Sequence, residues 1–436
     1  MAPPRAAGKH RLFVALVLAV IGLVTSSLVA LHPGLPADDA PPIARALARH
    51  GSGTAPSRRL GPAVPPHVDF AVVLVLWNPQ NYSQRVARFR ETLGRLERTD
   101  DAKAWVVAVE LVYGANAFLI PRPVPPQRFS SMRFRLPAGE VSWCKERLVN
   151  LAVDALPRSV RFVAWVDSEV AFTNPLWVAQ ARWALAQHGF AQLFERVHFL
   201  GPRAEILDTE RSLGAQLASG ALWAEMDKNA SHASKSQRPH FAHPGYAWAA
   251  TRDALERTGG LLARTFGGAD KHMAFALVHR ANLSFFTPPL GRRQRALAAN
   301  GSLARRAPEA YFAHVLRWQA RAKAAGLRGF GVVPGALNHS WHGDIRNRAY
   351  LTRWKIIHAF ALDPDAVFAL NADGLDVWTA AASPMLRHMV AKHFAKRNED
   401  RAQPLPPRWA KRSAADDADR GGDDDDDDDD DALNTR

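Results

Sequence analysis

The strongest constraint on the fold is an alternation of apolar strands and amphipathic helices. Phe70–Leu76 is an uninterrupted apolar run, as expected of a strand buried on both faces, and apolar residues then recur at helical spacing over Val86–Leu96. The order repeats with a strand at Trp105–Val112, a helix at Trp143–Ala155 and a strand at Phe162–Val166. This pattern predicts an α/β domain with a mainly parallel central sheet flanked by helices.

Two acidic residues follow the last of these strands. Asp167 and Glu169 come directly after Val166. Ligands of open α/β sheets bind beyond the carboxyl ends of the strands, and two carboxylates there suit a hard divalent cation that also binds phosphate oxygens. We therefore expect Mn2+ or Mg2+ at this point. The glycine patterns that bind phosphate in dinucleotide-binding and P-loop enzymes follow none of these strands.

The N-terminal residues predict the topology of the chain. Leu12–Leu31 carries no charge and, at about 1.5 Å per residue, is long enough to span a bilayer as a signal anchor. Basic residues precede it, so the positive-inside rule leaves a cytosolic tail over 1–11 and puts the rest in the lumen. A cleaved signal peptide is the alternative. Either topology agrees with the N-glycosylation sequons, which begin at Asn81, Asn229, Asn282, Asn300 and Asn338.

The remaining segments differ in composition. Residues 32–68 are rich in proline and are predicted to form an extended stem. We expect the catalytic domain over 69–362 and a C-terminal helical extension over 363–400. Residues 401–436 are polar and are expected to be a disordered acidic tail, because they lack the apolar residues that a core requires. We expect a single-pass type II protein in the membrane of the Golgi or of another compartment of the secretory pathway, with the catalytic domain in the lumen.

Charge and cysteine content narrow the classes of partner. The formal net charge is +14 even though the tail contains the acidic run Asp423–Asp431. A basic surface suits an anionic partner, but no zinc-finger, homeodomain or aromatic RNA-binding pattern is present, so no nucleic acid is expected. Cys144 is the only cysteine, which excludes an intramolecular disulfide, and its amphipathic surroundings predict a buried thiol.

Several later residues are candidates for chemistry. Asp270 closely follows a glycine pair, where it is suited to orient or deprotonate an acceptor hydroxyl; capping the helix through Met273 is the alternative. Glu195 follows the strand-like Ala191–Phe194 and is a second candidate base. His339 and His342 flank a tryptophan in a His-x-x-His-Gly cluster, which favours function over the ordinary role of a polar surface residue.

The order of these motifs resembles the GT-A-fold glycosyltransferases. In that superfamily a short acidic motif, usually D-x-D, ends a central strand and binds a metal that bridges the diphosphate of a nucleotide-sugar. Here the motif is Asp167-x-Glu169, with Glu in place of the last Asp. The resemblance implies that Glu169 binds the metal, that Asp167 contacts the metal, its water or the ribose, and that His342 is a further metal ligand, with His339 in reserve.

Donor-binding residues are implied in the same way. The segment Lys145–Val153 looks like the basic helix that precedes the acidic motif in many such enzymes. Arg147 and Asn150 share one face of it and are expected to contact the base or the diphosphate, unless they only cap a surface turn. Trp77, at the end of the first strand, and Arg346 are expected to complete the nucleotide-sugar site, since the arginine fork suits phosphate oxygens.

The predicted function is therefore a metal-dependent glycosyltransferase. Its partners would be a nucleotide-sugar donor, a glycan, protein or lipid acceptor, and the membrane that holds the N-terminal helix. Two other classes stay open. A non-catalytic carbohydrate-binding membrane protein with the same fold would bind sugar without turning over a donor, and a metal-dependent phosphohydrolase would release phosphate without an acceptor.

Overall fold

The computed structural model describes residues 60–61, 63–99, 101–123, 127–219, 242–285, 308–342 and 350–400. The chain divides into two compact units, Met1–Arg58 and Arg59–Arg436, and the first lies outside the described residues. The predicted cytosolic tail, membrane anchor, most of the stem and the acidic tail lie outside them too. No helix of the part that is described is long and apolar enough to cross a membrane.

Seven strands form the larger sheet of the second unit. They are β1 (Phe70–Trp77), β2 (Ala104–Tyr113), β3 (Phe129–Leu136), β4 (Phe162–Val166), β6 (Phe190–Gln192), β9 (Ala247–Thr251) and β10 (Gly331–Val332). Their order is β10-β6-β9-β4-β1-β2-β3. Every neighbouring pair is parallel except the two made by β9, which runs antiparallel to β4 and β6. The predicted α/β domain with a mainly parallel sheet is therefore confirmed.

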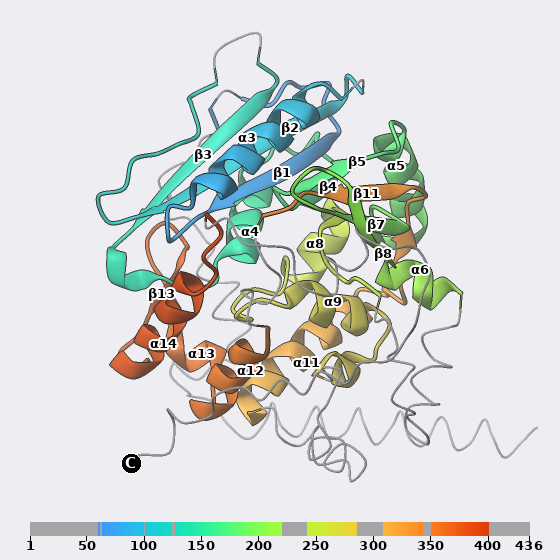
Figure 1. The fold of residues 1–436 in the computed structure, drawn as a ribbon. Coiled ribbons are helices and arrows are strands. Elements are labelled where there is room, and N and C mark those ends of the chain that lie inside the picture. Colours follow the sequence, from blue (N-terminus) through green and yellow to red (C-terminus); the bar gives the residue numbers. More distant parts are fainter. Residues whose placement is uncertain are drawn as a thin grey trace, which may run out of the picture. The chain divides into compact units, whose positions relative to one another are not determined.

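The sheet separates two apolar cores, because successive side chains of a strand point to opposite faces. In β1, Val72 and Leu74 belong to one core, whereas Ala71 and Val73 belong to the other. The first core is covered by α3 (Ser83–Glu97) and α5 (Trp177–His188). The second core is covered by α4 (Lys145–Ala155), α6 (Leu213–Ala218), α8 (Arg252–Thr258), α9 (Ala269–Leu277), α11 (Glu309–Ala324), α12 (Tyr350–Ala359), α13 (Pro364–Val367) and α14 (Pro384–Ala395). Figure 1 shows the later of these helices, coloured yellow to red, gathered together.

A smaller sheet adjoins the larger one through the acidic motif. Its strands are β5 (Val170–Phe172), β7 (Arg196–Leu200), β8 (Ile206–Arg211) and β11 (Ala336–His339), in the order β5-β11-β7-β8. β4 ends at Val166 and β5 begins at Val170. The turn Asp167–Glu169 is therefore the link between the two sheets. Short 3-10 helices lie at Ala138–Glu140 and Ala281–Phe285.

The C-terminal segment packs onto the sheet that carries this turn. Besides α13 and α14, the predicted helical extension contains a hairpin of β12 (Phe368–Leu370) and β13 (Asp376–Trp378). The ring of Phe394 in α14 meets Trp77 edge-on at a centroid distance of 4.7 Å. At the far end, Asp400 accepts hydrogen bonds from the first amides of α3, those of Ser83 and Gln84, at 2.7 and 2.8 Å.

Candidate active site

The acidic turn is held by backbone contacts on both sides. The amide of Asp167 donates to the carbonyl of Tyr246, just before β9, at 2.7 Å, and the amide of Ser340, just after β11, donates to the carbonyl of Glu169 at 2.7 Å. The turn thus leaves the carboxyl end of a buried parallel strand and is fixed by elements distant in sequence. This is the edge of an open sheet at which ligands bind.

Strand β11 brings a histidine pair beside the acidic turn. It runs antiparallel to β5, and its His339 lies opposite Val170. His339 and His342 are both buried, with ring centroids 5.1 Å apart. The Asp-x-Glu and His-x-x-His motifs, far apart in sequence, therefore meet where the two sheets join.

The chemistry of these side chains fits a divalent cation. Carboxylate oxygens from Asp167 and Glu169 are hard ligands of the kind that Mg2+ and Mn2+ prefer. Among the described residues, no three His, Cys, Asp or Glu side chains are gathered into a preformed metal site. A cation held here would need further ligands from water and phosphate oxygens, as Mg2+ commonly does in nucleotide-binding enzymes.

Lys145, the first residue of α4, links two carboxylates. Its Nζ forms an ion pair with Asp167 and lies 3.8 Å from Oδ2 of Asp270, in the first turn of α9. Burial alone would lower the pKa of Lys145, but the two carboxylates outweigh it and raise that pKa above its usual value. One positive charge is therefore shared between the acidic turn and the candidate base.

A third carboxyl group lies in the same region with little compensation. Glu146 is buried, and the Nε1–H of Trp143 donates to its Oε2 at 2.8 Å. Burial raises the pKa of Glu146 to about 7, against the opposing effect of Lys145. Burial also raises the pKa of Asp270, and the charge of Asp167 adds to that rise while Lys145 opposes it. Perturbed carboxyl groups of this kind are typical of functional sites.

The loop before β9 forms the wall next to Asp270. A Cβ added at Gly245 would stand 3.3 Å from Oδ2 of Asp270 and 3.3 Å from Cε1 of His243. The rings of His243 and Tyr246 stack with centroids 3.8 Å apart. Tyr246 has a φ of 79°, a conformation that costs a non-glycine residue roughly 1–3 kcal/mol. Such strain is found where the surrounding structure fixes a functional loop.

The structure places Trp77, an expected donor contact, inside an aromatic cluster. Its side chain is 4% exposed, its Nε1–H donates to the hydroxyl of Tyr113 at 2.9 Å, and its ring packs on Trp143 and Phe394. The ring that was expected to contact a nucleotide therefore packs against other aromatic rings in this structure. The prediction of a buried thiol is confirmed, because Cys144 is buried nearby and burial raises its pKa to about 12.

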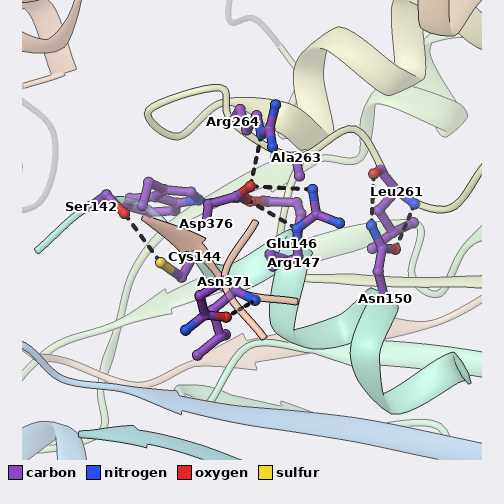
Figure 2. Close-up of polar contacts among 12 residues, drawn as sticks. Ser142, Cys144, Glu146, Arg147, Asn150, Leu261, Ala263, Arg264, Asn371 and Asp376 are labelled. Atoms are coloured by element: carbon purple, nitrogen blue, oxygen red, sulfur yellow. Dashed lines mark hydrogen bonds and ion pairs between the residues drawn. The ribbon is translucent and has the colours of Figure 1, made fainter. Parts of the chain in front are cut away.

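Arg147 and Asn150, the expected donor contacts of α4, have partners within the chain. Arg147 pairs with the buried carboxylate of Asp376 at 3.1 and 3.3 Å, and Arg264 donates to the same carboxylate at 2.7 Å. The amide of Asn150 exchanges hydrogen bonds of 3.0 and 2.7 Å with the backbone of Leu261. Figure 2 shows both arrangements. Arg147 and Asn150 therefore tie helix α4 to β13 and to the loop after α8.

The other predicted residues are placed as follows. Glu195 lies just beyond the carboxyl end of β6, a strand parallel to β4, and its side chain is 38% exposed near Arg196. Asp270 is not the N-cap of α9, because that position is Gly268. Arg346 lies outside the described residues. Lys145 and Glu146 lie in the helix that was expected to bind the donor but were not themselves predicted as site residues, because Lys-Glu at a helix start usually faces water.

Comparison with known proteins gives weak similarities. No protein family model matches the chain, and no curated protein matches it. Similar solved structures include the catalytic domain of Drosophila beta-1,4-galactosyltransferase 7 with xylobiose, at a TM-score of 0.26 and 9% identity over 49% of this chain and 62% of that one. A mutant of the same enzyme with manganese, UDP-Gal and xylobiose gives a TM-score of 0.27 and 8% identity over 62% and 65%.

A third structure comes from a bacterium. Glucosyl-3-phosphoglycerate synthase from Mycobacterium tuberculosis, with Mn2+, UDP and glucosyl-3-phosphoglycerate, gives a TM-score of 0.31 and 15% identity over 58% of this chain and 80% of that one. The chain spans less than two thirds of the galactosyltransferase chains. These scores carry no argument, so the function rests on the residues of this chain.

Proposed function

We propose that the chain transfers a sugar from a nucleotide-diphosphate-sugar to a hydroxyl group of an acceptor, with the help of a divalent metal. The observation that carries this proposal is the gathering of Asp167, Lys145 and Asp270 at the carboxyl edge of the sheet, beside Glu169 and the histidine pair. Manganese and UDP-Gal accompany one of the similar structures.

The acidic turn would hold the donor. Asp167, Glu169 and His342 would bind the cation together with water and phosphate oxygens, and because these side chains are not gathered into a preformed site among the described residues, they would have to move closer together around it. The cation would supply positive charge that makes the diphosphate a better leaving group. Glu169 and His342 are buried, and the backbone of the turn is already held, because the amide of Ser340 donates to the carbonyl of Glu169 at 2.7 Å. A backbone that is already held leaves less of the chain to be ordered when a donor binds, and such ordering reduces affinity.

Asp270 would accept the proton in an inverting reaction. The acceptor oxygen forms a bond to the anomeric carbon, while the bond from that carbon to the diphosphate oxygen breaks and its electron pair leaves with the nucleoside diphosphate. The hydroxyl proton passes to the carboxylate of Asp270. Burial raises the pKa of Asp270, which increases its affinity for the proton, and Lys145 at 3.8 Å limits that rise so that the ionised form remains accessible.

The location is part of the proposal. A type II anchor at Leu12–Leu31 would place the described unit in the lumen of a secretory compartment, and the Golgi is the compartment we propose. Asn81 is exposed at the loop after β1 and would then be open to N-glycosylation. The test is expression in animal cells followed by endoglycosidase treatment. A smaller loss of mass in the Asn81→Gln variant than in the wild type would support lumenal exposure.

The first experiment is a screen of the full chain in detergent against a panel of nucleotide-sugars, with Mn2+, Mg2+ or EDTA, in which released nucleoside diphosphate is measured. We expect one donor to be used, release to depend on the metal, and an Asp167→Asn, Glu169→Gln double variant to be inactive although folded. A folded protein that is silent with every donor would favour the non-catalytic carbohydrate-binding protein. Full activity in the double variant would exclude the proposed metal site.

A further inference from the structure

The loop between β2 and β3 is held down by arginine side chains. Residues 114–123 follow the carboxyl end of β2 and lie on the face of the sheet that α3 covers, since Ile120 is buried and Leu119 packs on the same core as α3. Arg90 of α3 donates to the carbonyl of Leu119 at 3.1 Å, and Arg133 of β3 donates to that of Ile120. Positive side chains from two elements therefore meet at this loop.

Phe118 of the loop brings a third guanidinium group to the same place. The guanidinium carbons of Arg133 and Arg135 lie 5.2 and 4.9 Å from the centroid of its ring. Because both distances end on one ring, these two charges are held within about 10 Å of each other. Arg135 also donates to the carbonyl of Gly114. Arg90 and Arg135 are exposed, and we call Arg90, Arg133 and Arg135 the arginine surface.

The arginine surface has more positive charge than nearby carboxylates balance. Its guanidinium groups donate to backbone carbonyls, and among the described residues none of them forms an ion pair. Glu110 lies opposite Arg133 in the strand register, but it is buried and its two carboxylate oxygens accept from the amides of Leu119 and Ile120 at 2.5 and 3.0 Å. Three guanidinium groups thus share one buried carboxylate at the outermost strand of the larger sheet. Such a surface suits a partner with several anionic groups.

The described C-terminal segment ends beside this surface. Glu399 pairs with Arg85 at 2.6 Å, and the carboxylate of Asp400 accepts from the amide of Ser83 at 2.7 Å. Two carboxylates of this segment therefore already contact the first turn of α3. Arg90 is seven residues beyond Ser83 in the same helix, which is roughly 10 Å at about 1.5 Å per residue. The residues that continue from Asp400 begin close to the arginine surface.

We propose that the acidic run Asp423–Asp431 of the same chain binds the arginine surface. The run lies outside the described residues, and 22 residues separate it from Asp400. A flexible chain of that length spans about 25 Å on average, which is enough to reach Arg90. Guanidinium groups pair with carboxylates through two parallel hydrogen bonds, so nine consecutive carboxylates complement three arginines. This inference does not depend on the proposed function.

Binding of a labelled nona-aspartate peptide tests the proposal on the full chain in detergent, at low ionic strength. The comparison is with an uncharged-tail chain, in which all nine aspartates of the run Asp423–Asp431 are replaced by asparagine. We expect the uncharged-tail chain to bind the peptide at least tenfold more tightly than the wild type, measured by fluorescence anisotropy. The reason is that a tethered acidic run competes at an effective concentration in the millimolar range, far above that of the peptide.

Two matched double variants of the uncharged-tail chain locate the peptide. Arg90→Gln with Arg135→Gln removes two charges of the arginine surface, and Arg158→Gln with Arg203→Gln removes two arginines whose side chains are 80% and 82% exposed. Arg203 lies between β7 and β8, which Figure 1 shows at the right, whereas β3 is at the upper left. We expect the first variant to weaken binding about fivefold or more and the second to change it less than twofold. If the first variant loses thermal stability, Arg135→Gln alone decides the question.

Three results would overturn the proposal. Equal binding of the peptide to the wild type and to the uncharged-tail chain would show that the tail does not occupy the surface. Equal losses in the two double variants would show that the peptide responds only to overall charge. Binding of the uncharged-tail chain to mixed micelles of phosphatidylserine and detergent, but not to the peptide, would assign the surface to lipid. None of these results depends on turnover of a donor, so this proposal and the transferase can fail separately.

Discussion

Helix α4 carries two buried charge clusters that differ in how completely their charges are balanced. At its first turn, Lys145 pairs with both Asp167 and Asp270, and Glu146 nearby accepts a hydrogen bond from the indole N–H of Trp143. At the next residue, Arg147 joins Arg264 on the single carboxylate of Asp376. The first cluster has too many carboxyl groups for its one lysine. In the second, two guanidinium groups share one buried carboxylate, and a more exposed one, that of Asp365, lies 3.5 Å from Arg264.

Under the proposed function, the difference separates a cluster suited to chemistry from one that stabilises the fold. A carboxylate with two arginine forks keeps its charge and holds β13 against α4, so it stabilises the packing of the C-terminal segment. Carboxyl groups that are buried without enough positive charge bind protons more tightly, which costs stability but suits proton transfer near neutral pH. Burial alone does not distinguish the two, because both clusters are buried.

The largest expected effect is on catalysis at the first cluster. Asp270→Asn keeps the shape of the side chain but removes the carboxylate that we propose accepts the proton. We expect the turnover of whichever donor the screen identifies to fall about 10²- to 10⁴-fold. Thermal stability should stay the same or rise, because a buried carboxyl group with a raised pKa is replaced by a neutral amide. A large loss of stability with little loss of turnover would reverse the comparison between the clusters.

The second cluster should respond in the opposite way. Asp376→Asn leaves Arg147 and Arg264 buried against a neutral group, which should cost about 3–5 kcal/mol of unfolding free energy, measured by urea titration. Asp253→Asn is the control, because it breaks an ion pair with Arg257 in which the aspartate side chain is 70% exposed, and should cost less than about 1 kcal/mol. Equal losses in the two variants would show that the pair at Asp376 is not structural.

The second cluster also shows why sequence reasoning assigned Arg147 to the donor. Its partner Asp376 is 229 residues away, and no local pattern announces that contact. The contact of Trp77 could not be predicted for the same reason. An aromatic residue at a strand end suits either a ligand or a core, and the ring that packs on it belongs to the distant Phe394 in α14. Lys145 was overlooked because it looks like an ordinary solvated residue at a helix start until Asp167 and Asp270 are seen around it.

The parts of the fold that the sequence did predict have strong local signals. β1, β2 and β4 are apolar runs, and such runs predict strands buried on both faces. β3 was missed because Arg133, Arg135 and two serines interrupt its apolar residues, as a strand at the edge of the sheet allows. The direction of β9 depends on the path of the chain around the sheet, and the sequence of a short strand such as Ala247–Thr251 does not record it.

A pH titration of stability sharpens the comparison further. The pKa of Glu146 rises from 4.5 to about 7 on folding, so between those values the folded protein holds a proton that the unfolded chain has released. The contribution of Glu146 therefore falls as the pH rises through this interval and is constant above it, with a total change on the order of 3 kcal/mol. Urea titrations of Glu146→Gln, which does not titrate, should lack this fall. A wild type and variant that stay parallel from pH 4.5 to 7 would contradict the raised pKa.

The smallest effect tests position rather than charge. Gly245→Ala adds a methyl group 3.3 Å from Oδ2 of Asp270, which is tight enough to move that carboxylate by a few tenths of an ångström without changing any charge. Because a misplacement of about 1 Å can cost 10²-fold in rate, this smaller shift should lower turnover by about tenfold or less. Gly139→Ala, with no atom within 4 Å of its Cβ, is the control for alanine itself and should leave the rate unchanged.

If Gly245→Ala instead lowers stability by as much as Asp376→Asn does, the loop before β9 is part of the structural framework. If it lowers turnover alone, the first cluster depends on the position of its carboxylates as well as on their unbalanced charge.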